Sequence, residues 1–162
     1  MELMISVKGN KYTVTDKKQQ RLLYTIKKKA FVGGKYLLLD ASNYQLYTIV
    51  QTSDDKKPMF SITHNDVSLM KLECKSLFLD PTIIVDGKDT AGTPIKYAIT
   101  SKEHKDFQLL KDELPEGKLL VHITVSGELQ YEIEIEDKVF DDYIPLFAIA
   151  VDITFGNMNR GR

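Results

Sequence analysis

Three consecutive lysines, Lys27, Lys28 and Lys29, are the residues of this chain whose type and spacing best suit ligand binding. Neighbouring ammonium groups can hold a phosphate or another polyanion, and such binding weakens as salt screens the charges. Four more basic residues lie nearby in the sequence and complete the candidate anion-binding set: Lys17, Lys18, Arg21 and Lys35. A second interpretation stays open, because lysines on strand edges also prevent edge-to-edge aggregation.

Catalytic chemistry has weaker support. The histidines His64, His104 and His122 are scattered, and none stands at a metal-site or catalytic-triad spacing from Cys74 or a carboxylate. We expect His64 in a turn and His122 on the solvent face of a strand. The phosphate-loop pattern GxxxxGK[ST] is also absent from the sequence. We therefore predict a protein that is not an enzyme, with no catalytic residues, metal ligands or cofactor.

Three carboxylates, Glu132, Glu134 and Glu136, alternate with apolar residues near the end of the chain. Side chains two apart in a strand point to the same face. This pattern predicts a solvent-facing acidic ladder, and a cation site there is the alternative. Cys74 is expected to be a small residue of the core or of a strand.

The composition is that of an ordinary globular protein, with 43% apolar and 28% charged residues in 162. We expect one domain spanning residues 1–162, and the single cysteine favours a cytoplasmic location. The net charge of −1 argues against general nucleic-acid binding. Residues 1–57 carry 11 basic and 5 acidic residues, a charge of +6, while the remainder carries −7. The basic part can either attract an anionic surface or fold against the acidic part.

A repeated β-hairpin is the strongest pattern in the sequence. Residues 12–26 and 36–49 each contain a strand-like run, an Asp, a short polar stretch and a second run, offset by 24 and then 23 residues. Asp16 and Asp40 are predicted to open the turns, because Asp can bond its own backbone there. Gly33-Gly34 is expected to reverse the chain between the hairpins.

Further strand candidates follow and bring the expected number to about ten to twelve, as in a sandwich or barrel. They are residues 60–64, 69–74, 81–99 with turns at DGKD (86–89) and AGTP (91–94), 118–125 and 129–136. Residues 101–117 interrupt the series. Phe107, Leu110 and Leu114 stand three and four apart, which predicts a helix ending near Pro115. The FQLL within it fits a strand as the alternative.

The last apolar run changes character. Apolar residues from 143 to 155 cover every side of a helix, and such a helix must be buried. Asp141 and Asp142 suit its start, Pro145 its first turn and Gly156 its C-cap. A helix over about residues 142–155 would be about 21 Å long, whereas a membrane span needs about 20 apolar residues. We therefore predict no transmembrane segment, a helix inside a closed barrel, and a short polar tail over 156–162. The partner of Asp152 stays open.

The paired segments YTVTDKKQQRLLYTIKKKAFVGGKYLLLDASNYQLYTIV and the ending VFDDYIPLFAIAVDITF resemble the LURP-one-related family of the tubby C-terminal-like superfamily. The resemblance covers residues 4–155 and is poorer over 52–118. It implies a mainly β fold, a twelve-stranded antiparallel barrel around a hydrophobic C-terminal helix. It carries over no catalytic residues. What it implies about function is limited, because the superfamily spans several roles: tubby proteins bind phosphoinositide head groups through basic residues on the barrel exterior, related phospholipid scramblases are associated with membrane lipids, and plant members are linked to defence.

Our leading hypothesis is a binding module for phosphoinositide or other anionic lipid head groups, peripheral to a membrane. The alternative is a protein-interaction or scaffold domain that uses an exposed strand edge or a helix over 102–114. An enzyme with an unrecognised site is the third hypothesis.

Overall fold

A computed structural model describes residues 1–29, 34–53 and 56–160 of the chain. It contains twelve strands followed by one helix. These are β1 (Glu2–Lys8), β2 (Lys11–Asp16), β3 (Leu22–Lys28), β4 (Lys35–Asp40), β5 (Gln45–Ser53), β6 (Met59–His64), β7 (Val67–Ser76), β8 (Thr82–Lys88), β9 (Pro94–Ser101), β10 (Asp106–Lys111), β11 (Leu114–Ile123), β12 (Leu129–Ile135) and α1 (Pro145–Arg160). This is the predicted fold class.

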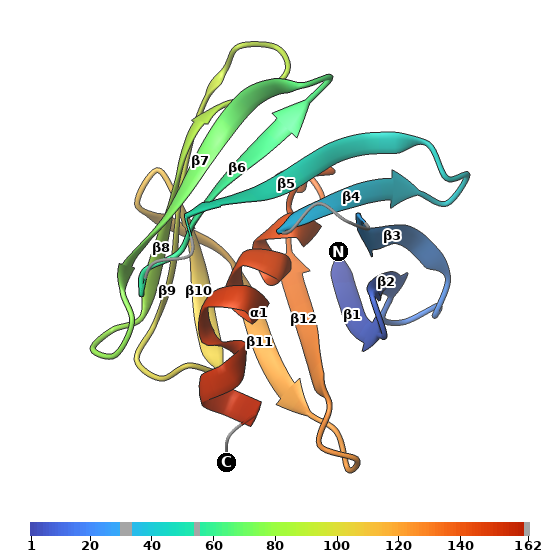
Figure 1. The fold of residues 1–162 in the computed structure, drawn as a ribbon, viewed down its shortest axis with the longest axis vertical. Coiled ribbons are helices and arrows are strands. Elements are labelled where there is room, and N and C mark those ends of the chain that lie inside the picture. Colours follow the sequence, from blue (N-terminus) through green and yellow to red (C-terminus); the bar gives the residue numbers. More distant parts are fainter. Residues whose placement is uncertain (30–33, 54–55, 161–162) are drawn as a thin grey trace.

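The strands form one closed antiparallel barrel. Each pairs with its neighbours in the sequence, and β1 closes the ring by pairing with β12, with Ile5 opposite Tyr131. Alternate residues of each strand point inward, as in β1, where Leu3 and Ile5 are fully buried. The inward side chains surround α1, which runs through the barrel (Figure 1).

The connections between antiparallel strands alternate between the two ends of the barrel, so they define two rims. The helix-entry rim comprises residues 17–21, 41–44, 65–66, 89–93, 112–113 and 136–144. The helix-exit rim comprises, among the described residues, 9–10, 29, 34, 56–58, 77–81, 102–105 and 124–128. Asp142, just before α1, accepts a hydrogen bond from Tyr24 near the entry rim. Asn159, in the last turn of α1, donates to the backbone oxygen of His104 on the exit rim at 3.0 Å.

The helix is longer than predicted and shifted along the chain. It begins at Pro145 and continues to Arg160, so the expected C-cap at Gly156 and the polar tail from residue 156 are wrong. Gly156 is buried inside the barrel. A helix end at a buried position would leave backbone groups without hydrogen-bond partners, so the helical hydrogen bonds continue through the glycine. No helix among the described residues is long and apolar enough to span a membrane.

Two other sequence expectations fail. Residues 101–117 form no helix, because Phe107 and Leu109 point into the core from β10 while Gln108 between them is exposed. The turn expected at DGKD (86–89) is instead the end of β8, and the chain reverses at residues 89–93.

The two turns opened by aspartate form as predicted. Asp16 Oδ1 accepts from the backbone nitrogens of Lys18 and Gln19, each at 2.9 Å. Asp40 Oδ1 accepts from two backbone nitrogens of its own turn in the same way. Gly34 has a φ of 72°, whereas Gly33 lies outside the described residues.

Candidate anion-binding surface

The seven predicted basic residues do not form one cluster. Lys17, Lys18 and Arg21 lie on the β2–β3 connection at the helix-entry rim. Residues 27–29 and Lys35 lie at the opposite rim, where β3 ends and β4 begins. The length of β3 separates the two groups by about 20 Å, at about 3.3 Å per residue.

Lys17 already has a carboxylate partner. Its ammonium lies 2.8 Å from Glu132 Oε2, and this hydrogen bond raises the pKa of Lys17. Glu132 also contacts His122 Nε2 at 3.0 Å and is only 3% exposed. The expected solvent exposure of the acidic ladder is therefore wrong at Glu132, because Lys17 and His122 cover it. Lys18 and Arg21 are exposed, and so is Lys17 despite its ion pair.

The strand register brings two unpredicted lysines to the exit-rim group. Lys8 lies opposite Lys11 across the β1–β2 pair, and Lys11 lies opposite Lys27 across the β2–β3 pair. Residues directly opposite each other share a face of the sheet, here the outer one. The sequence contained both lysines, but only the pairing of β1 with β2 and β3 shows that they join Lys27.

Backbone hydrogen bonds hold the other lysines of this rim beside them. The amide of Lys28 donates to the oxygen of Asn10 at 3.0 Å, and that of Lys29 to the oxygen of Lys35 at 2.8 Å. We call the six residues the lysine cluster: Lys8, Lys11, Lys27, Lys28, Lys29 and Lys35. Five are exposed, and Lys35 is partly exposed. Within the described part of the chain, none of the six forms an ion pair with a carboxylate.

Lys28 shows why the strand end matters. Its position in the alternation is the inward one of Ile26, and it pairs with Tyr36. Because β3 ends at Lys28, the side chain reaches solvent at the rim instead of entering the core. The cost of burying an unpaired ammonium is therefore avoided.

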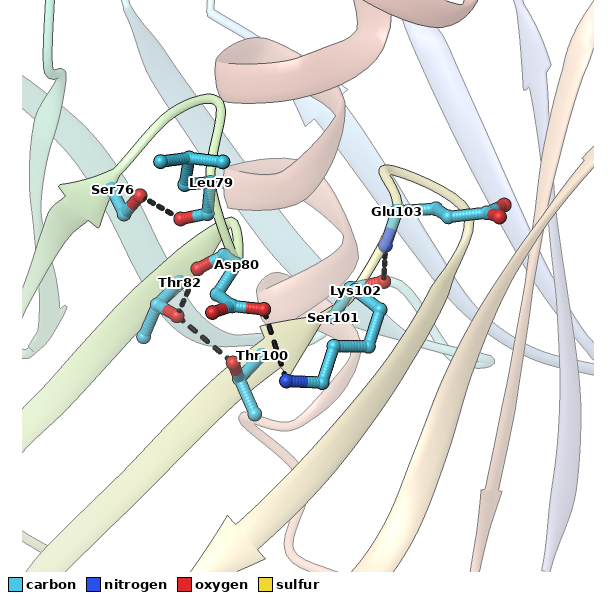
Figure 2. Close-up of polar contacts among 8 residues, drawn as sticks. All are labelled: Ser76, Leu79, Asp80, Thr82, Thr100, Ser101, Lys102 and Glu103. Carbon is cyan, nitrogen blue, oxygen red and sulfur yellow. Dashed lines mark hydrogen bonds and ion pairs between the residues drawn. The ribbon is translucent and has the colours of Figure 1, made fainter.

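A groove of about 600 Å³ also opens on the exit-rim side of the barrel, outside the lysine cluster. Its lining includes three carboxylates, Asp80, Glu103 and Asp106, and one lysine. That lysine, Lys102, lies 3.1 Å from Asp80 Oδ1 (Figure 2). The acidic lining does not suit an anion, so the lysine cluster is the candidate site.

The three histidines have local partners. His64 Nδ1 lies 2.9 Å from the oxygen of Leu46, and His104 Nε2 lies 2.6 Å from that of Leu77. His122 contacts Glu132, on the partly exposed outer face where it was expected. Over the described residues, no group of three or more His, Cys, Asp or Glu side chains is placed to hold a metal ion.

Comparison with known proteins fits this architecture. A profile of the LURP-one-related family matches residues 1–153. The chain belongs to the LURP-one-related family. Its fold is similar to that of an Arabidopsis thaliana protein solved by X-ray crystallography, with a TM-score of 0.61 at 14% identity over 96% of this chain and 90% of the other. No curated protein shows significant similarity to this LURP-one-related chain.

Proposed function

We propose that this LURP-one-related protein is a non-enzymatic module that binds anionic phospholipid head groups, phosphoinositides included, through the lysine cluster. The observation that carries the proposal is the gathering of six lysines at one rim without carboxylate partners among the described residues. Each lysine near an anionic membrane surface contributes about 1 kcal/mol of attraction. Together they supply enough for peripheral membrane association.

The closed barrel weakens the competing interpretation of these lysines. Lysines protect a sheet edge from pairing with another chain, but a closed barrel has no such edge. Every described strand pairs on both sides here. The lysine cluster therefore has no aggregation-prone edge to protect. This favours ligand binding as the explanation for the grouping of its lysines.

The same geometry removes the two surfaces on which the scaffold hypothesis rested. Among the described strands none has an exposed edge, and residues 102–114 form a connection and β10 instead of a helix. A protein partner would need another surface, and we favour the lipid function.

Vesicle co-sedimentation tests the proposal. The probe is phosphatidylcholine vesicles with and without phosphatidylserine or a phosphoinositide. Replacing Lys27, Lys28 and Lys29 together by Gln should weaken binding about a hundredfold, since three contributions of about 1 kcal/mol are lost. Wild-type binding should also fall as added salt shortens the screening length.

The chain offers a matched control at the opposite rim. Lys18 and Arg21 are exposed and basic, so the double variant Lys18→Gln/Arg21→Gln changes a similar charge away from the proposed site. We expect it to bind like the wild type. Equal losses from both variants would show attraction by net charge alone, and absence of wild-type binding to all anionic vesicles would refute the proposal.

A further inference from the structure

The helix-exit rim carries the most exposed large apolar side chains in the described part of the chain. These are Val125, fully exposed at 110%, Leu79 at 85% and Phe78 at 73%. Tyr44 at 69% and Leu114 at 62% follow, and both lie at the helix-entry rim or beside it. Val67 at 58% also lies beside the entry rim. Isolated exposed apolar residues are common on proteins, so the informative feature is that the three most exposed all lie on the exit rim.

The connection that presents Phe78 and Leu79 is held firmly at its base. The Ser76 hydroxyl donates to the Leu79 oxygen, and Thr82 Oγ1 donates to the Asp80 oxygen at 2.7 Å (Figure 2). His104 binds the oxygen of Leu77 from the next connection. The two apolar side chains therefore project from a loop that is fixed by polar contacts below them.

Val125 occupies a similarly fixed turn between β11 and β12. The Gly127 amide donates to the Thr124 oxygen at 2.9 Å, and the Glu128 amide donates to Thr124 Oγ1 at 3.1 Å. Small polar residues and glycine dominate such turns. The Val125 side chain at the tip therefore contributes no burial to the fold, and it is exposed to solvent.

The order of strands places these two apolar connections on either side of the basic part of the rim. Going round the rim from Val125, the next three connections are those of β1–β2, β3–β4 and β5–β6, and the fourth carries Phe78 and Leu79. Asp54 and Asp55, between β5 and β6 in the sequence, lie outside the described residues. The described residues of the three intervening connections and their strand ends hold no carboxylate. They hold eight lysines: Lys8, Lys11, Lys27, Lys28, Lys29, Lys35, Lys56 and Lys57.

The helix-entry rim has the opposite charge. Its connections carry eight carboxylates and four basic residues: Asp66, Asp89, Asp112, Glu113, Glu136, Asp137, Asp141 and Asp142, with Lys17, Lys18, Arg21 and Lys138. Counted in the same way over the described residues, the connections of the helix-exit rim carry three carboxylates and five basic residues: Asp80, Glu103 and Glu128, with Lys29, Lys56, Lys57, Lys102 and Lys105. An anionic surface would therefore repel the entry rim and attract the exit rim. Charge and apolar exposure therefore select the same end of the barrel.

We infer that the protein docks end-on to an anionic bilayer, with Phe78, Leu79 and Val125 inserted among the lipid chains and the intervening lysines on the head groups. The inference rests on the proposed lipid binding and adds its orientation and its apolar component. In Figure 1 the β7–β8 and β11–β12 connections and the C-terminus all lie toward the bottom of the view. The lysines supply the salt-sensitive part of the affinity, and the apolar tips supply the salt-resistant part.

Because the chain has no tryptophan, one introduced tryptophan reports its own surroundings. The reporters are the full-length variants Phe78→Trp and Val125→Trp, and Tyr44→Trp is the matched control at the opposite rim. On vesicles of phosphatidylcholine and phosphatidylserine, we expect a blue-shifted emission from both reporters and quenching by brominated acyl chains. Tyr44→Trp should bind equally well without either change.

The outcomes separate this inference from the proposed function. Co-sedimentation without a shift at Phe78→Trp and Val125→Trp refutes insertion and leaves head-group binding in place. A shift in Tyr44→Trp reverses the orientation and also refutes it. If the wild type does not bind anionic vesicles, the proposed function fails, and this inference fails with it.

A second variant tests the energetic role of the tips. Phe78→Ser/Leu79→Ser changes two exposed side chains, so its thermal unfolding should match the wild type. Its affinity for the anionic vesicles should fall about tenfold or more, with the largest ratio at high salt, because apolar transfer is lost. An unchanged affinity would refute the inference. A second outcome would also refute it: the wild type is a dimer in solution, the variant is a monomer, and both bind vesicles equally. The apolar tips would then form a self-association surface.

Discussion

Asp152 is a carboxylate buried in the middle of an apolar helix, and two tyrosines of the barrel wall account for it. Tyr12 donates to Oδ2 at 2.6 Å, and Tyr131 donates to Oδ1. Hydroxyl donors stabilise a carboxylate that burial would otherwise disfavour. Since Tyr12 lies on β2 and Tyr131 on β12, Asp152 fastens α1 to the strands on either side of β1.

Asp152→Ala should therefore destabilise the protein by about 3 kcal/mol, because two buried hydroxyls lose an acceptor. The measurement is urea unfolding followed by circular dichroism. Thr154→Val is a matched control on the same helix, since the Thr154 hydroxyl is buried without a hydrogen-bond partner in the described structure. It should leave the stability unchanged or raise it. Equal effects of the two substitutions would contradict the fastening role of Asp152.

Glu132 is a second buried carboxylate with polar partners, and it lies on the outer face of the barrel. Burial would raise its pKa, but hydrogen bonds from Lys17 and other neighbours, including His122, lower it below the ordinary value of 4.5. Glu134 beside it has a raised pKa, because it hydrogen-bonds to Glu132 and lies near the same charge. Of the two carboxyl groups, Glu132 therefore keeps its negative charge to the lower pH.

A carboxylate with a lowered pKa in the folded state contributes stability above its unfolded pKa and loses it as the pH falls through the folded value. Glu132→Gln should accordingly cost about 1 to 2 kcal/mol at neutral pH, since Lys17 and His122 are partly exposed and solvent screens them. The difference from the wild type should shrink as the pH falls below 4.5, which urea titrations across that range measure. A difference independent of pH would show that the charge of Glu132 is not involved.

At the scale of elements, ambiguous residues explain where sequence reasoning failed. The spacing of Phe107, Leu110 and Leu114 fits a helix, but β10 and β11 share these residues across the turn at Asp112 and Glu113. Both turn residues have positive φ, 50° and 71°, without the glycine that usually marks such a turn. Asp112 is a residue type that favours turns, but Glu113 is not, so the helical spacing outweighed the strand alternative at FQLL.

Gly87 was mistaken for a turn residue for a related physical reason. A Cβ there would lie 2.1 Å from the backbone oxygen of Leu69 and 2.7 Å from the Cα of Met70. Glycine in a strand can mark the close approach of another backbone, and β7 makes that approach here. The same residue type serves turns and close contacts, and only the partner strand distinguishes them.

Gly87→Ala should lower the stability by about 3 kcal/mol or more, because two backbone segments must separate to admit the methyl group. Gly92→Ala is the control. Gly92 has a φ of 85° but open space around it, so only the conformational cost of about 1 kcal/mol applies. Thermal unfolding compares the two variants. A loss for Gly87→Ala no greater than that for Gly92→Ala would contradict the close approach.

For the whole molecule, the fold was predictable, and the grouping of charges was predictable only for Lys27, Lys28, Lys29 and Lys35. Repeated hairpins and an apolar final helix are local patterns, and together they indicate a barrel around a helix. The lysine cluster depends on pairings between segments distant in the sequence, such as Lys11 with Lys27. Sequence proximity suggested Lys17, Lys18 and Arg21 instead, but a strand carries neighbours in the sequence to opposite rims.

The barrel depends on α1 for its stability. Leu146, Phe147, Ile149, Val151 and Phe155 are 0% to 1% exposed, and their contacts are with the inward faces of the strands. At about 2 kcal/mol each, these five side chains contribute about 10 kcal/mol, which is comparable with the whole net stability of a typical domain. The inward side chains of the strands would lose their burial as well. Without the helix, the net free energy of unfolding would therefore be too small to keep the barrel folded.

A chain ending at residue 142 should therefore fail to fold, without cooperative thermal unfolding and with strong binding of a dye for exposed apolar surface. Full-length Asn157→Ala is the control, because Asn157 is an exposed residue of the same helix and its substitution removes no burial. Adding a peptide of residues 141–162 to the truncated chain should restore cooperative unfolding if the helix acts by filling the barrel. A truncated chain that unfolds cooperatively by itself would contradict this. The strands would then form a closed barrel without the helix, and the helix would bind to a preformed barrel instead of forming its core.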